Sequence, residues 1–253
     1  MDDNLIKANL NLYAVLQNFE ELCGLDGEAR DIIKTWDLSI QFSVRKGAKA
    51  CLVFKNGACE HRRGPISSPS ISLYFISSAH CNKMFEGKAT PVILKGFTRL
   101  KYLIRDFPKL TGRLEFYLKP TDALLKDSAY LSVNTRMTLN TAAFAVRELA
   151  LNDDNSKLNA GQIGFGTVLI KVAPDGPSVS IEFKKDDITV SKIEPERPEC
   201  SLSINGIRTA NAFFNGKIDT YSAVARGDIA IRGIAPMLDS MAMILNRIPL
   251  YLS

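Results

Sequence analysis

The spacing of hydrophobic residues changes along the chain from helical to alternating and back again. Apolar side chains recur every three or four positions over residues 5–19, which predicts an amphipathic helix, and Asp26 can begin a second, short one. Alternation of apolar and other side chains follows over 38–44 and 50–54, with a tight turn at Gly47 between the two runs. This order predicts helices followed by antiparallel strands.

The same order of patterns returns in the second half of the chain. A helical apolar face over 142–150 precedes alternating runs at 167–172 and 179–183. In both halves a further strand and a helical stretch follow, and Pro236 stands where a final helix can begin. Each half is therefore predicted to combine a small, mostly antiparallel or mixed sheet with helices, which is the α+β class.

An internal repeat explains this similarity. Residues 47–88 match residues 176–217 without a gap, and ten of the 42 aligned positions are identical. The match resumes near both ends, where 112–118 aligns with 246–252. We therefore predict two diverged copies of one domain, arranged in tandem.

The repeat also sets the predicted domain limits. The first copy is expected over 1–118, a partly helical linker over 119–136, and the second copy over 137–253. The chain has 253 residues, 46% of them hydrophobic and 23% charged, which is typical of a globular protein and excludes a disordered or fibrous one. No apolar run reaches the length of a membrane span, and five scattered cysteines favour a reducing compartment, so we expect a cytoplasmic protein.

The second copy closes with regularly placed glycines and apolar residues. The marked positions are Gly216, Lys217, Asp219, Ala223, Gly227, Ile229, Ile231 and Gly233. This run resembles the ending of the sterol carrier protein type 2 domain, although Thr220 and Asp228 replace that family's usual proline and lysine. The first copy keeps Gly87, Lys88 and Gly96, and its resemblance rests mainly on the repeat.

The resemblance implies a fold and a function for both copies. It implies a small curved sheet covered by helices, with an apolar tunnel between them that accepts sterols, fatty acids or acyl-CoA. It also implies a domain without catalytic residues of its own, so the expected function is non-catalytic binding or transfer of a hydrophobic ligand: a fatty acyl chain, a sterol-like molecule or another lipid. The better-matching second copy is the expected binding domain.

The last predicted helix is rich in methionine, with three of the chain's six methionines at 237–243. Flexible, polarisable methionines suit a cavity that accepts variable apolar shapes, although such a helix face can equally pack as ordinary core. The candidate ligand-binding residues are Ile181, Phe183, Phe213, Phe214, Tyr221, Met237, Met241, Ile244 and Leu245.

Basic residues recur at roughly helical spacing between 95 and 113. Five of them, Lys95, Arg99, Lys101, Arg105 and Lys109, are candidates for contact with an anionic membrane surface; a solvated helix face is the alternative. The whole net charge of +5 lies in residues 1–118, which contain 17 Lys and Arg and 12 Asp and Glu. No nucleic-acid-binding motif accompanies this excess, so no nucleic-acid partner is predicted.

The sequence does not favour catalysis or metal binding. Cys51, Cys59, His61, His80 and Cys81 lack the paired spacing of zinc ligands. The glycine-rich residues 161–166 lead into a predicted strand, whereas a dinucleotide fingerprint leads into a helix. We therefore predict neither an enzyme, a metal nor a cofactor.

A second hypothesis comes from a different functional class. In it the pockets are filled by protein side chains, and the two copies form an interaction or oligomerisation module. A monomer and a homo-oligomer are both compatible with the sequence. A void in the ligand-free structure would favour lipid binding over this alternative.

Overall fold

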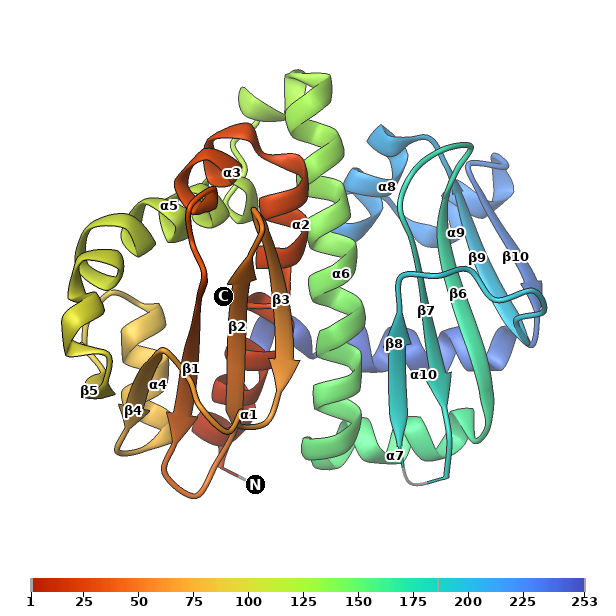
Figure 1. Ribbon diagram of the computed structural model, residues 1–253. Coiled ribbons are helices and arrows are strands. Elements are labelled where there is room, and N and C mark those ends of the chain that lie inside the picture. The colour runs from red at the N-terminus through yellow and green to blue at the C-terminus, as the bar shows by residue number, and fades with distance from the viewer. Residues whose placement is uncertain (1, 186, 253) are drawn as a thin grey trace. The chain divides into compact units, whose positions relative to one another are not determined.

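The computed structural model describes residues 2–185 and 187–252 (Figure 1). The chain separates into two compact units, Met1–Lys119 and Pro120–Ser253. Each unit contains a five-stranded mixed sheet with helices packed against it, which confirms the predicted α+β class. None of the helices in the described residues combines the length and apolar character that a membrane crossing requires.

The first unit begins with helices and ends with a helix, with the sheet between them. Its elements are α1 (Asp3–Leu10), a π-helical turn (Asn11–Val15), α2 (Asn18–Leu25), α3 (Gly27–Ile33), β1 (Leu38–Val44), β2 (Lys49–Lys55), β3 (Ala58–Arg63), β4 (Ile71–Phe75), α4 (Ser78–Phe85), β5 (Val92–Lys95), a 3-10 turn (Phe97–Arg99), a π-helical turn (Tyr102–Asp106) and α5 (Phe107–Leu118). The strand order is β3-β2-β1-β4-β5, with β1 and β4 parallel and the other pairs antiparallel.

Aromatic side chains join the helices of this unit to its sheet. Phe42 on β1 lies with its ring centroid 6.4 Å from that of Phe107, which begins α5. Phe107 in turn lies 5.7 Å from Phe19 on α2. Because alternate residues of β1 face the same side of the sheet, this contact places the hydrophobic core between the sheet and helices α2 and α5.

The second unit repeats this arrangement. Its elements are a 3-10 turn (Leu124–Lys126), α6 (Ser128–Asn152), α7 (Asp154–Ile163), β6 (Gly166–Ala173), β7 (Ser178–Phe183), β8 (Ile188–Ser191), β9 (Cys200–Asn205), α8 (Ile207–Phe214), α9 (Thr220–Ala225), β10 (Ile229–Gly233), α10 (Ala235–Leu245) and a final 3-10 turn (Ile248–Leu250). The strand order is β10-β9-β6-β7-β8, and β6 with β9 is the parallel pair. The interval 119–136, predicted as a linker, overlaps the beginning of α6.

The two sheets agree in register except at one turn. In the parallel pair of the first unit Ile40 lies opposite Ile71, and in that of the second unit Val168 lies opposite Cys200. Equivalent residues of β1 and β6 are therefore 128 positions apart in the sequence, whereas those of β4 and β9 are 129 apart. The turn after β6 is one residue longer than the turn after β1. A one-residue slip inside a strand would move every core side chain to the opposite face, so the extra residue is accommodated in the turn.

The basic stretch from 95 to 113 is not one helix. Lys95 ends β5, and Gly96 follows with a φ of +99°. A Cβ atom at Gly96 would lie 2.8 Å from the backbone oxygen of Ser70, so the chain passes too close to β4 for a side chain there. Short 3-10 and π-helical turns follow, and α5 starts at Phe107 with Pro108 in its first turn, where proline is tolerated.

Candidate functional site

A cavity of about 380 Å³ opens on the second unit beside the β7–β8 hairpin. Its walls come from the end of α6, from α7 and the turn after it, and from the hairpin. The lining residues are Ala150, Leu151, Lys157, Ala160, Gly161, Gly164, Phe165, Phe183, Lys184, Lys185, Asp187 and Ile188. This volume lies within the range of about 300–1,000 Å³ that is usual for small-molecule sites.

The apolar part of the cavity is built from paired strand residues and small helix residues. Phe183 on β7 pairs directly with Ile188 on β8, so both side chains face the same side of the sheet, and both are buried. On α7, Gly161 lines the cavity, and a Cβ atom at this position would meet nothing within 4 Å. Phe165, just after α7, is a largely exposed aromatic residue at the same cavity.

The charged part of the cavity consists mainly of lysines. Lys157 lies 3.5 Å from Asp154, and Lys184 lies 2.8 Å from Glu182, each measured between Nζ and a carboxylate oxygen. Within the described part of the chain, Lys185 makes no ion pair. The site therefore combines an apolar surface with cationic groups, which can bind an apolar molecule that carries an anionic end.

Most of the predicted ligand-binding residues lie elsewhere in the second unit. Phe183 is the member of that set that lines the cavity. Four others, Ile181, Met237, Met241 and Ile244, are buried in the helix-and-sheet core. The half-buried members are Phe213, Phe214 and Leu245. Tyr221 belongs to α9, and its side chain lies outside the described residues.

Met237 shows how the space beneath α10 is occupied. A Cβ atom built at Gly166, where β6 begins, would lie 3.1 Å from Cε of Met237, so this methionine packs directly on the sheet. Met237 and Met241 are therefore core residues, whereas Met243 on the same helix is 60% exposed. A ligand tunnel between α10 and the sheet stays a prediction.

Sequence reasoning missed a buried cluster that occurs once in each unit. Asp153 caps α7 by accepting from the Ser156 backbone N–H at 2.8 Å. Its carboxylate also accepts from Arg247 Nε at 2.6 Å and Nη2 at 2.8 Å, and from the Tyr251 hydroxyl at 3.0 Å. Burial raises the pKa of the Asp153 carboxyl, but the hydrogen bonds from Arg247, Ser156 and Tyr251 outweigh it and hold the pKa well below its usual range.

The first unit has the same cluster at equivalent positions. Asp26 caps α3 by accepting from the Ala29 backbone N–H at 2.7 Å, and accepts from the Tyr117 hydroxyl at 2.9 Å. Arg113 Nη2 donates to the same carboxylate at 2.5 Å. Burial raises the pKa of the Asp26 carboxyl, but the hydrogen bonds from these groups lower it overall. We call the two sets the Asp–Arg–Tyr clusters; each ties the end of its unit to the start of a helix near the beginning of that unit.

Three of the cysteine thiols, those of Cys51, Cys59 and Cys81, are held in their protonated form. Burial raises the pKa of the Cys51 thiol to about 11 and that of Cys81 to about 12. Burial also raises the pKa of Cys59 strongly, with a further contribution from the neighbouring Cys23 thiol. These groups are protonated at neutral pH, and the protonated thiol is the unreactive form.

The five predicted membrane-contact residues all lie in the first unit, between β5 and the first turn of α5. Lys95 and Arg99 line a second cavity, and Lys101, Arg105 and Lys109 follow it in sequence. Arg105 forms an ion pair with Asp106 at 2.9 Å.

Solved structures of sterol carrier protein domains are similar to this chain. The sterol carrier protein domain 2 of Helicoverpa armigera is 18% identical over 44% of this chain and 87% of its own, with a TM-score of 0.35. UbiJ-SCP2, a ubiquinone synthesis protein, is 9% identical over 40% of this chain and 86% of its own, with a TM-score of 0.33. Sterol carrier protein 2 from Yarrowia lipolytica is 15% identical over 40% and 91%, with a TM-score of 0.31.

The chain resembles the sterol carrier protein 2 domain. Each of these three structures matches 40–44% of this chain. No protein-family model and no curated protein matches the sequence.

Proposed function

We propose that the protein binds a hydrophobic ligand without catalysing a reaction, and that the second unit holds this ligand in the cavity beside the β7–β8 hairpin. The observation that carries the proposal is a cavity in which the exposed Phe165, beside the buried pair Phe183 and Ile188, meets a lysine-bearing rim. The ligand class is a single acyl chain or similar lipid with an anionic end. The sequence pattern of 216–233 supports the same class through its resemblance to a lipid-binding family.

In the first unit the equivalent space is filled by an aromatic side chain. Phe54 is the repeat partner of Phe183, and the indole of Trp36 packs against it edge-on with ring centroids 4.9 Å apart. Trp36 is almost fully buried, whereas Phe165, close to the equivalent position of the second unit, is exposed. We therefore expect one ligand per chain, bound by the second unit.

A single substitution can obstruct the proposed cavity. Gly161 lies on α7, and its missing side chain faces open space, so Gly161→Leu would place a bulky group there and favour the helix by about 0.5–1 kcal/mol. Gly112 on α5 is a matched control, because it is also a helical glycine at which an added Cβ atom would meet nothing within 4 Å. The measurement is native mass spectrometry with lipid extraction, followed by titration with a fatty acid.

The expected result is one bound lipid per chain, an affinity at least tenfold lower for Gly161→Leu, and no change for Gly112→Leu. Binding by Gly161→Leu equal to that of the unaltered protein would refute this location. If instead a Met237→Ala, Met241→Ala variant alone loses binding, the ligand lies beneath α10. If the protein binds no lipid at all, the interaction module becomes the better hypothesis, since the buried methionines already fill that space.

A further inference from the structure

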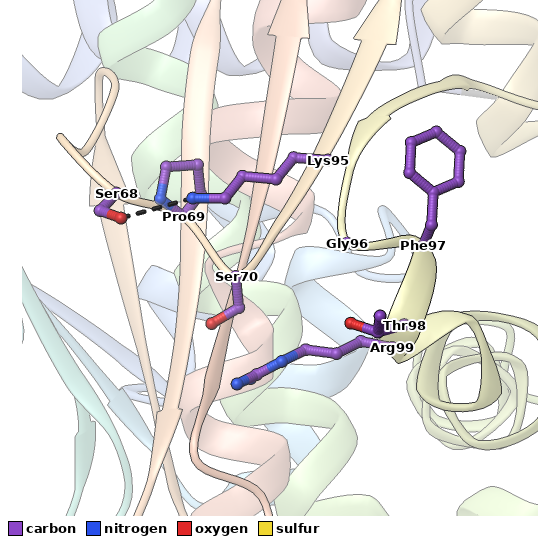
Figure 2. A pocket seen from close by; sticks show the side chains of 8 residues that line it. All are labelled: Ser68, Pro69, Ser70, Lys95, Gly96, Phe97, Thr98 and Arg99. Carbon is purple, nitrogen blue, oxygen red and sulfur yellow. Dashed lines mark hydrogen bonds between the residues drawn. The ribbon is translucent and has the colours of Figure 1, made fainter.

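The first unit has a cationic pocket that the ligand cavity does not explain. Its volume is about 490 Å³, and it lies where the loop before β4 faces the turn after β5. Figure 2 shows Lys95 reaching across it towards Ser68, with Arg99 extending in the same direction and Phe97 pointing away from both. The hydroxyls of Ser70 and Thr98 complete a polar lining.

The two cations of this pocket are not neutralised by acidic side chains. Lys95 Nζ lies 3.4 Å from Ser68 Oγ, and Arg99 Nη1 donates to the backbone oxygen of Asp37 at 3.2 Å. Among the described residues neither forms an ion pair with a carboxylate. Residues 92–109 contain five Lys and Arg and one acid, Asp106, so this segment carries a net charge of +4.

The same segment exposes large apolar side chains to water. The exposed fractions are 45% for Val92, 57% for Leu94, 65% for Phe97 and 70% for Ile104. Exposed apolar groups interspersed with unneutralised cations are characteristic of surfaces that bind at the interface of an anionic bilayer, where apolar groups enter the headgroup region and cations attract the lipids.

We propose that residues 92–109 dock the protein on an anionic phospholipid surface, with a headgroup phosphate in the Lys95–Arg99 pocket and Phe97 inserted among the lipids. Lysine, guanidinium and hydroxyl groups are the donors that phosphate oxygens accept from, and here all three line one pocket. The exposed apolar side chains interspersed with these cations favour a membrane over an acidic protein partner, which would match the charge alone. The site lies in the first unit and does not depend on the proposed ligand cavity in the second.

Sedimentation of the full chain with vesicles tests this proposal. The vesicles contain phosphatidylcholine alone or phosphatidylcholine with about one third phosphatidylglycerol. The test variant is Lys95→Gln, Lys101→Gln, which removes two exposed lysines of the segment. Its control is Lys34→Gln, Lys55→Gln, which removes two exposed lysines of the same unit at other places. Phe97→Ser is paired in the same way with Ile193→Ser, another largely exposed apolar residue.

We expect binding to the anionic vesicles only, weakened by salt. Each lysine near such a surface contributes about a fivefold change, so the test pair should lower the partition coefficient about 30-fold. The control pair should lower it much less, and Phe97→Ser should weaken binding where Ile193→Ser does not. Equal losses in test and control variants, no vesicle binding by the unaltered protein, or binding of inorganic phosphate without vesicle binding would each overturn the proposal. Gly161→Leu should bind vesicles normally, which separates this test from that of the ligand cavity.

Discussion

Replacing Asp153 by asparagine tests the physical role of the Asp–Arg–Tyr clusters. The carboxylate accepts five hydrogen bonds, three of them from Arg247 and Tyr251 near the end of the chain and two from Ser156. Asparagine has one acceptor oxygen and places an amide N–H₂ group where the second carboxylate oxygen accepted. The substitution preserves shape and removes the charge that these donors share.

The expected loss of stability follows from burial and charge. Charge-assisted hydrogen bonds each contribute about 1.5–3 kcal/mol, and removing one partner of a buried ion pair costs about 3–5 kcal/mol. The Asp153 side chain is 6% exposed, but that of Arg247 is 25% exposed and can recover some hydration. We therefore expect Asp153→Asn to lower the free energy of unfolding of the second unit by about 2–4 kcal/mol.

Urea unfolding followed by far-ultraviolet circular dichroism measures this loss at pH 7. Asp154→Asn is the control, because Asp154 is the next residue, 71% exposed, and its ion pair with Lys157 spans 3.5 Å. A surface pair of this kind contributes about 0–1 kcal/mol. If Asp153→Asn costs no more than Asp154→Asn, the cluster does not hold the second unit together.

Two further predictions concern acid and backbone geometry. The folded-state pKa values of Asp26 and Asp153 are both lowered, so their stabilisation is fully present above the unfolded pKa of about 4 and is lost as pH falls from there through the lower folded-state pKa. The melting temperature should therefore drop most steeply below about pH 4, and less steeply in Asp153→Asn. At Gly233, which has a φ of +89°, a Cβ atom would lie 2.0 Å from the backbone oxygen of Glu199. Gly233→Ala should therefore lower the free energy of unfolding by at least about 2 kcal/mol, whereas Gly112→Ala should raise it by about 0.5–1 kcal/mol; urea titration distinguishes the two.

The central strands could be predicted from the sequence because they are buried on the helix-facing side. In β1 the residues Leu38, Ile40, Phe42 and Val44 are all buried, and their alternation is visible without a structure. The edge strand β3 could not be predicted in this way. It contains Glu60, His61 and two arginines. An edge strand that is exposed to water needs no alternation of apolar residues, so its sequence carries no strand pattern.

The Asp–Arg–Tyr clusters illustrate a second limit of sequence reasoning. Arg113 and Arg247 occupy aligned positions at the matching ends of the two copies, but their acidic partners lie 87 and 94 residues earlier. Asp26 is recognisable as a helix cap, because a cap is defined by its immediate neighbours. Its contact with a distant arginine has no local signature, and only the folded chain brings the two together.

The two units share the same stabilising contacts but differ in the surface cavities that they form. Both have a buried Asp–Arg–Tyr cluster. Both also have a glycine whose backbone lies close to a backbone oxygen just before a neighbouring strand: Gly96 near Ser70, and Gly233 near Glu199. Because these contacts stabilise the fold, we expect the residues that form them to change less between the two copies than other residues do. In the first unit Trp36 packs on Phe54, so the space equivalent to the ligand cavity is filled, while the cationic pocket and exposed apolar residues lie near β5. In the second unit Phe165, close to the position equivalent to Trp36, is exposed and lines the cavity. Under the two proposals made above, the duplicated domain has diverged into a filled unit that contacts a membrane and an open unit that holds the ligand, and each proposal can be tested without the other.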